Sequence, residues 1–394
     1  MDPIPPAEAP LEVEGRVLSW REVFLYFLML GFINVGGPVA QITMMFNQMV
    51  ERRRWLSKDR FVKIMAFCHM LPGPEALQIA IYVGYLKRGW LGGIVAGLTF
   101  VLPGAAIMVA LSWLYVTYGN LPQVNDALYI LKPAVLGIIA AGLIKLGRAT
   151  IKSAALAALL AAAFVGVRFI GVDFLIILLA AGLLHVIWRE GRARAAPPPA
   201  IAVALPLMLG GILSAVYPDW LQMAWLFLKT GLFSFGGAYA SIAFLQRGAV
   251  DEFGWLTAGQ LLDGVALSVA TPGPFMLFTT FVGFIAGGLP GAIIATFFVF
   301  LPSFVFVLAG ARYVESLHDN RIAQTFLAGV SAAVVGVILV VSLDLAPAAL
   351  VDAPSVVIAA AVFAAITVRK ADVALVAVGA MAAGIAYAGL RMLR

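Results

Sequence analysis

The chain has 394 residues, of which 63% are hydrophobic and 12% charged, and its formal net charge is +6. A soluble globular domain carries about twice that share of charged residues, so the composition excludes this class and predicts an all-α polytopic membrane protein. The single cysteine excludes an internal disulfide framework and argues against a cysteine-based zinc site. The basic residues lie in short loops between apolar segments, which indicates membrane topology rather than nucleic-acid binding.

The chain opens with a Pro- and Glu-rich polar tail, residues 1–18, in which we see no cleaved signal peptide. An apolar segment follows at 24–50 and is interrupted by Gly36, Gly37 and Pro38. Glycine and proline weaken helices, so we expect a break in the middle of this segment. The next stretch, 51–63, is a loop with six Lys and Arg residues.

The segment 71–90 opens with Pro72, Gly73 and Pro74. Each proline lacks a backbone N–H and disfavours a helical residue before it, so a helix should end near Leu71 and another should start at Pro74. The N–H groups at the new start need burial in protein or a wet cavity, and they attract anions. The break is therefore a candidate anion site, although such residues can also simply kink helices for close packing.

Polar side chains accompany the two breaks. After the second break, Glu75, Gln78, Tyr82 and Tyr85 recur at helical spacing and form one polar stripe. Asn34 and Gln41 flank the first break. Neutral hydrogen-bonding groups suit an oxyanion, but each of them alone can equally join neighbouring helices.

Four further apolar spans follow at 90–116, 124–146, 153–167 and 172–188. Lys132 lies in the second of these, and an intramembrane lysine is costly and by default functional. It could pair with a bound oxyanion or with Glu75, or it could extend to the membrane surface. Glu75 could couple transport to a proton or merely stabilise a helix start. His69 has no metal-ligating partner nearby, so we expect a packed histidine.

After a basic, Pro-rich linker and an apolar segment at 200–216, the chain repeats itself. Gly36-Gly37 returns as Gly236-Gly237, and the Pro-Gly-Pro motif returns as Pro272-Gly273-Pro274, both shifted by 200 residues. Trp55, Pro103 and Gly137 also have counterparts, at shifts of 199 or 200. This is an internal duplication, as many secondary transporters have. We expect four regions: 1–18, the first repeat 19–188, a linker with one extra helix at 189–219, and the second repeat 220–394.

The charges predict that the two repeats are inverted. The loop 51–63 has six Lys and Arg residues, whereas its counterpart 247–263 has one, together with Asp251, Glu252 and Asp263. Basic loops stay in the cytoplasm. If the broken segments are re-entrant hairpins, the basic loop and most other Lys and Arg residues are cytoplasmic and the C-terminus is periplasmic. If they cross the membrane fully, the basic loop lies outside.

Several long motifs, in order and twice, resemble the chromate ion transporter family of the long-chain, two-repeat type. They are GFINVGGPVAQI, LPGPEALQIAIYVGYLKRGWLGGIVAGLTFVLPG and KPAVLGIIAAGLIKLGR in the first half, and KTGLFSFGGAYASI, WLTAGQLLDGVALSVATPGP and GVSAAVVGVIL in the second. The resemblance implies a bacterial inner-membrane transporter that expels chromate, a sulfate-like oxyanion, and confers resistance. The second repeat departs from the first, because Phe275, Phe278, Ala238 and Ser331 replace Glu75, Gln78, Pro38 and Lys132.

We therefore predict a substrate site that takes residues from both repeats: Asn34, Gly36, Gly37, Gln41, Pro72, Gly73, Pro74, Glu75, Gln78, Tyr82, Lys132, Gly236, Gly237, Pro272, Gly273 and Pro274. We expect chromate and membrane lipid as partners, with sulfate as a further candidate substrate, a homodimer as one arrangement, and no cofactor, metal or nucleic acid. A membrane enzyme is disfavoured by the lack of carboxylate-cluster, HExxH and nucleophile-elbow motifs. A carrier of another tetrahedral oxyanion and an anion channel stay open as alternatives.

Overall fold

The computed structural model describes residues 18–34, 38–119, 121–190, 219–235, 239–310 and 321–392. Over these residues the regular structure is helical, which confirms the predicted all-α class. Five of the described helices are long and apolar enough to cross a membrane. The predicted pairs Gly36-Gly37 and Gly236-Gly237, the linker and the apolar segment 200–216 lie outside the described residues.

The first half contains a run of short helices followed by long ones. In chain order these are α1 (Trp20–Ile33), α2 (Pro38–Phe46) with a π-helical continuation (Asn47–Arg52), α3 (Lys58–Met70), α4 (Glu75–Tyr118), α5 (Pro122–Thr150), α6 (Ala154–Val165) with a π-helical continuation (Gly166–Ile170), and α7 (Phe174–Glu190). The backbone of α4 is not helical at Arg88 and Gly89, so this element consists of two helices, 75–87 and 90–118.

The second half repeats the same order. Its elements are α9 (Asp219–Leu232), α10 (Tyr239–Leu245) with a π-helical continuation (Gln246–Glu252), α11 (Ala258–Ala270), a 3₁₀ turn (Phe275–Leu277), α12 (Phe278–Gly310), α14 (Arg321–Ala349), α15 (Ala353–Thr367) and α16 (Val373–Met392). The backbone of α12 is not helical at Gly287 and Gly288. Gly288 has a φ of +61° and its counterpart Gly89 has a φ of +64°, so the duplication extends to the details of the backbone.

The Pro-Gly-Pro motifs end one helix and start the next, as predicted. Leu71 and Thr271, which precede the first proline of each motif, both have ψ of 145° and terminate α3 and α11. This extended conformation is the one that a following proline favours. One detail differs from the prediction: Pro74 is not the first helical residue of α4 but its N-cap, in an extended conformation, and the helix begins at Glu75.

A pair of short helices surrounds each described break, and we call each pair a hairpin. The 13 residues of α3 span about 20 Å, whereas the hydrocarbon core of a bilayer is about 30 Å thick. In the first repeat, contacts join the ends of the two hairpins to the α1 region. The guanidinium of Arg53, in the loop after the first hairpin, lies 4.7 Å from the ring of Tyr26 in α1, and the side chain of Arg88, after the second hairpin, donates to the backbone of Leu18.

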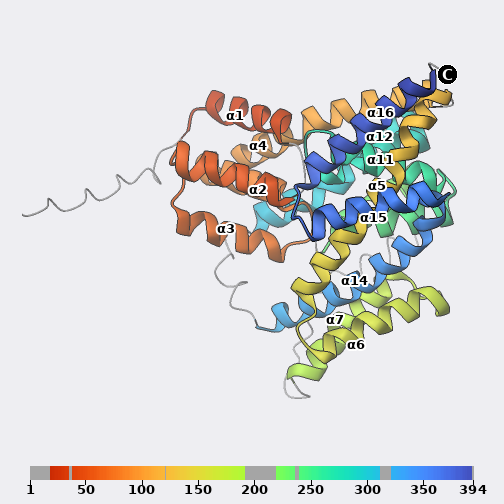
Figure 1. Ribbon diagram of the computed structural model, residues 1–394. Helices are drawn as coiled ribbons and strands as arrows, with labels where there is room; N and C mark the ends of the chain where they lie inside the picture. Colours follow the sequence, from red (N-terminus) through yellow and green to blue (C-terminus); the bar gives the residue numbers. More distant parts are fainter. Residues whose placement is uncertain are drawn as a thin grey trace, which may run out of the picture.

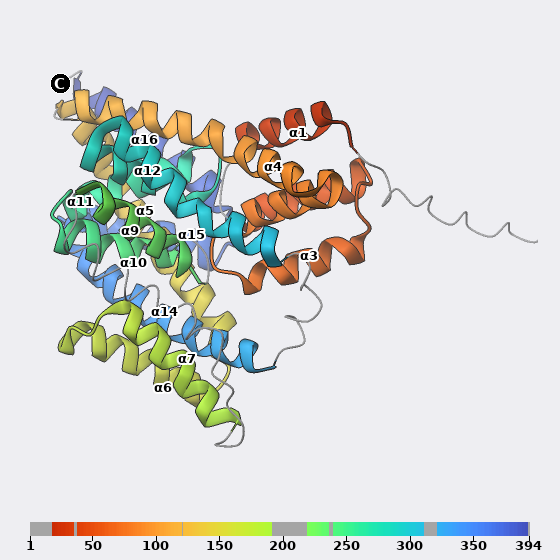
Figure 2. The same cartoon turned by 180° about the vertical axis from the view of Figure 1, so that it is seen from behind.

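The two pairs of hairpins occupy opposite sides of the molecule, as an inverted repeat requires. Figure 1 shows α1, α2 and α3 on one side and α11 on the other, and Figure 2 shows α9 and α10 beside α11 on that second side. The long helices α4, α5, α12 and α14 run between the two sides. The end of α16 lies opposite the start of α1.

Candidate functional site

The breaks of the two repeats meet inside the protein. The backbone N–H of Gly73 donates to the carbonyl of Ser234 at 3.2 Å, and the N–H of Gly273 donates to the carbonyl of Asn34 at 2.8 Å. Asn34 follows the end of α1, and Ser234 follows the end of α9. Each of them therefore lies just before the first break of its repeat. Each Pro-Gly-Pro motif thus joins the first break of the other repeat, in two equivalent contacts.

Glycine is required at the centre of both motifs. Gly73 has a φ of +115° and Gly273 a φ of +107°, in the left-handed region that residues with a Cβ rarely adopt. A Cβ on Gly73 would also lie 2.5 Å from the hydroxyl oxygen of Ser303 in α12. The backbone conformation and the close contact with α12 therefore both require glycine at the centre of the first motif.

The long helix of each repeat supports the break of the other repeat. A Cβ on Gly104 of α4 would lie 2.3 Å from the carbonyl oxygen of Pro272, so the backbones of α4 and the second motif are in direct contact. Ser303 of α12 holds the equivalent place beside Gly73. Pro103-Gly104 and Pro302-Ser303 are counterparts in the duplication, and the arrangement is accordingly two-fold.

Two buried amides hold the breaks in shape. The side chain of Gln41 in α2 donates from Nε2 to the carbonyl of Gly273 at 2.8 Å. The side chain of Gln78 in α4 donates from Nε2 to the carbonyl of Pro72 at 2.6 Å. The structure thus brings together Asn34, Gln41, Gln78 and both Pro-Gly-Pro motifs, as the sequence predicted.

Several polar atoms at this junction are buried without a partner. Asn34 is fully buried, and neither atom of its amide has a hydrogen-bond partner among the described residues; the same holds for Oε1 of Gln78 and the hydroxyl of Ser303. Each buried polar group left unpaired costs about 1–3 kcal/mol. Such a cluster indicates a place where a ligand or water supplies the missing hydrogen bonds.

The start of α4 carries an acid–base pair. No side chain caps the first turn of α4 by a hydrogen bond, and Glu75 is its first residue. Oε1 of Glu75 lies 2.8 Å from Nδ1 of His69, the last-turn histidine of α3. The side chain of His69 is 47% exposed, so the expectation of a packed histidine is wrong. Glu75 holds this histidine, which faces away from the core.

The residues of the polar stripe after the first motif lie in different surroundings. Gln78 reaches the break, whereas Tyr82 is buried with its ring packed edge-on against Phe67 at 5.8 Å between centroids. Tyr85 lies beside Tyr82, at 6.4 Å. On the second repeat the matching positions, Phe275 and Phe278, are buried against one another and form an apolar wall.

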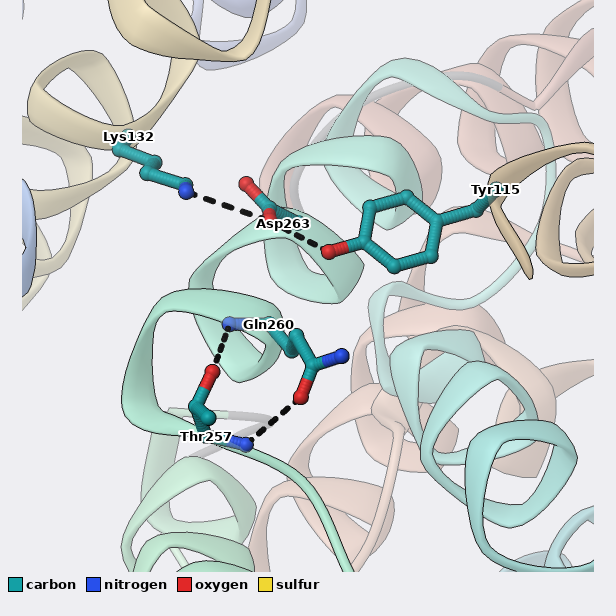
Figure 3. Close-up of polar contacts among 5 residues, drawn as sticks. All are labelled: Tyr115, Lys132, Thr257, Gln260 and Asp263. Carbon is teal, nitrogen blue, oxygen red and sulfur yellow. Dashed lines mark hydrogen bonds and ion pairs between the residues drawn. The ribbon is translucent and has the colours of Figure 1, made fainter. Parts of the chain in front are cut away.

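Lys132 pairs with an aspartate that the sequence reading missed. Its ammonium lies 3.4 Å from Oδ2 of Asp263 in α11, and the hydroxyl of Tyr115 in α4 donates to the same oxygen at 2.9 Å (Figure 3). Asp263 is 1% exposed. Lys132 therefore pairs with Asp263 and not with Glu75, one of the partners considered from the sequence.

This charged cluster lies apart from the breaks. Asp263 precedes Pro272 by nine residues, which is two and a half turns or about 13 Å along α11. The sequence reading counted Asp263 among the acidic residues of a loop. Its place inside a capped helix, between Leu262 and Gly264, was the signal that could have identified it: the capping box of Thr257 and Gln260 starts α11 about one and a half turns earlier (Figure 3).

Comparison with known proteins gives one consistent family. The family model described as chromate transporter matches residues 21–186 and again 221–385. A chromate transport protein of Pseudomonas aeruginosa is 36% identical over 91% of this chain and 88% of its own length. A chromate transport protein of Cupriavidus metallidurans is 32% identical over 86% of each chain, and a probable chromate transport protein of Synechococcus elongatus is 33% identical over 81% of this chain and 83% of its own. No solved structure matches.

Proposed function

The chain belongs to the chromate transporter family, and from this premise we propose that it exports chromate across the bacterial inner membrane as a secondary active transporter and so confers chromate resistance. The observation that carries the proposal is the junction of helix breaks from both repeats, with buried polar groups that lack a partner. Transporters built from inverted repeats bind their substrate at such a junction near the membrane midplane.

The chemistry of the junction suits a tetrahedral oxyanion. Chromate needs N–H and O–H donors and partial positive charge. The amide of Asn34, the hydroxyl of Ser303 and the uncapped N-terminus of α4 offer these groups without a metal. Hydrogen bonds to a charged group are worth about 1.5–3 kcal/mol each. We propose that Gln41 and Gln78 hold the two Pro-Gly-Pro breaks in place for the anion.

Two residues from the predicted site have a different proposed role. Glu75 is a carboxylate beside the proposed anion, and its pairing with His69 reduces the repulsion between them. Lys132 is neutralised by Asp263, about 13 Å along α11 from the second motif, so we assign it to the transport cycle and not to direct contact with chromate.

We further propose that the side on which α1, α2 and α3 lie is cytoplasmic and that the C-terminus is periplasmic. The six Lys and Arg residues of the loop 51–63 support this orientation. The duplicated halves and the buried junction favour alternating access over an open channel. Sulfate, with the same shape and charge, is the competing substrate, and a homodimer is the oligomeric state that we would test first.

The decisive experiment is the flux of labelled chromate in proteoliposomes that contain the purified chain, with sulfate and proton gradients set independently. We expect saturable uptake that an opposing sulfate load stimulates by exchange. Flux that does not saturate and shows no exchange would identify a channel. Sulfate flux without chromate flux would identify a sulfate carrier, and no anion flux in protein of native stability would contradict the proposed function.

A further inference from the structure

The second hairpins of the two repeats are packed differently, although their sequences are in register. Val62, Lys63 and His69 of α3 are exposed. Their counterparts at a shift of 200, namely Leu262, Asp263 and Val269 of α11, are buried. An inverted repeat with a fixed symmetric structure would bury both helices alike, so the structure holds the two hairpins in two different states.

The packing partners explain the difference. Helix α11 packs against α5, α14 and α16 in addition to α12, whereas α3 packs mainly against α4. In the duplication α14 is the counterpart of α5, and α7 is the counterpart of α16. By the duplication, the equivalent contacts of α3 would be with α14, α5 and α7, and among the described residues α3 makes no extensive contact with any of these three helices.

A charged cluster secures the packed hairpin. Asp263 joins α11 to α5 through Lys132 and to α4 through the hydroxyl of Tyr115 (Figure 3). The ring of Tyr115 also packs edge-on against Phe281 in the second half of the same hairpin, at 5.0 Å between centroids. The other repeat has no equivalent attachment, because Lys63 and Ser331 stand where Asp263 and Lys132 would be needed.

We propose that this structure is the state in which the α3 side is open to solvent, and that the bridge from Asp263 to Lys132 and Tyr115 is the latch that keeps the α11 side closed. In the opposite state α11 leaves α5 and α3 closes onto α14. The half-exposed His69 at the end of α3, paired with Glu75, supports an open α3 side, because a polar side chain faces water at far lower cost than hydrocarbon. The inference rests on the proposed transport function and adds the residues that keep the α11 side closed.

The test uses one matched pair of positions. Ala66 of α3 is partly exposed and its counterpart Ala266 of α11 is 1% exposed. The variants Ala66→Cys and Ala266→Cys, each in a Cys68→Ala background, place a single thiol at equivalent sites. Their reaction with a membrane-impermeant maleimide is followed in right-side-out and in inverted vesicles, with and without Asp263→Asn. The asparagine keeps the size of the side chain and an acceptor for Tyr115 but removes the charge that Lys132 binds.

In the parent background we expect Ala66→Cys to react from the cytoplasmic side and Ala266→Cys to react very slowly from either side. Adding Asp263→Asn should raise the rate at Ala266→Cys by about tenfold or more, from the periplasmic side, and lower the rate at Ala66→Cys, because the two states exchange population. Tyr115→Phe, which removes one hydrogen bond and keeps the ring, should move both rates in the same directions by a smaller factor.

A higher labelling rate at position 266 without a lower rate at position 66 would mean that Asp263 stabilises only the local packing of α11. Unchanged labelling rates at both positions would mean that Asp263 does not restrain a moving element. Either result overturns the latch. Chromate flux of the single-cysteine chains separates this inference from the proposed function. Flux without a labelling response contradicts the latch alone, whereas a labelling response without flux of chromate supports the latch and contradicts the substrate.

Discussion

At the scale of single residues, the proposed site depends on groups that have no hydrogen-bond partner among the described residues. Asn34, Gln78 and Ser303 keep buried polar atoms unpaired at the junction of the breaks. A soluble core would replace them by apolar residues of similar volume, because that change removes the cost of desolvation. Their presence at the junction supports the proposal that this place binds the substrate, at a cost in stability.

Gln78→Leu tests this interpretation against the second repeat. The leucine removes the hydrogen bond to the carbonyl of Pro72 and leaves that carbonyl buried, so we expect chromate flux to fall by about tenfold or more, in line with 1–3 kcal/mol. Phe278→Leu at the equivalent position is the control, and we expect it to keep most of the flux. Measurements are made at matched amounts of membrane protein. Equal losses in both variants would contradict an asymmetric site.

Gly73→Ala tests the backbone of the break. The alanine must adopt a φ near +115° and its Cβ meets Ser303, so we expect transport to be lost with a strain of about 1–3 kcal/mol. Gly171→Ala is the matched control, because Gly171 has a φ of +73° but no neighbour within 4 Å of a Cβ. The control carries the backbone strain without the contact. If both variants transport equally well, the shape of the break does not matter.

Lys132→Met and Asp263→Asn are expected to differ. The methionine leaves a buried carboxylate without its cation, which costs about 3–5 kcal/mol, so the amount of folded protein in the membrane should drop. The asparagine leaves Lys132, whose side chain is 26% exposed and retains some access to solvent. The double variant should restore the amount of folded protein, as judged by size-exclusion chromatography in mild detergent. No recovery would argue against a paired charge.

At the scale of elements, the molecule is organised by contacts between the repeats. Each Pro-Gly-Pro motif is hydrogen-bonded to the residue before the first break of the other repeat. It also packs against the long helix of that other repeat. Helices of 13 residues such as α3 and α11 are too short to cross a membrane alone, so each hairpin meets the opposite repeat inside the protein.

Gly104→Ala probes this support. The added methyl group would lie 2.3 Å from the carbonyl oxygen of Pro272, and backbone must shift to admit it. We expect a loss of stability of about 1–3 kcal/mol, seen as a lower unfolding temperature in detergent, together with reduced flux. Gly379→Ala in α16 has no atom within 4 Å of its Cβ and should be neutral in both measurements. An unchanged unfolding temperature for Gly104→Ala would show that the two backbones do not touch.

At the scale of the whole molecule, the inverted repeat predicts opposite sides for equivalent loops. The loop that follows the first hairpin, 53–57, should be accessible from the cytoplasm, and its counterpart 253–257 from the periplasm, because only the former region is rich in Lys and Arg. Epitope tags inserted in each loop, with protease or antibody access in oriented vesicles, measure this directly. Finding both tags on one side would falsify the inverted arrangement.

The sequence by itself determined the class, the duplication and the positions of the breaks. These follow from local rules: an apolar composition demands helices in a bilayer, a proline stops the helix before it, and a repeated pattern of glycine and proline folds twice in the same way. The ends of α3 and α11 at the two motifs confirm those rules, and the pairing of the motifs with Gln41 and Gln78 agrees with the predicted set of site residues.

Only the tertiary structure decided which partners the charged residues take. Lys132 and Asp263 are 131 residues apart, and Glu75 and His69 lie on different helices, so no spacing rule connects them. The same holds for the burial of α11 beside the exposure of α3, which depends on how the long helices pack and not on the register of the repeat. Periodicity fixes the face on which a side chain lies, but the neighbour across that face is set by the packing of the whole chain.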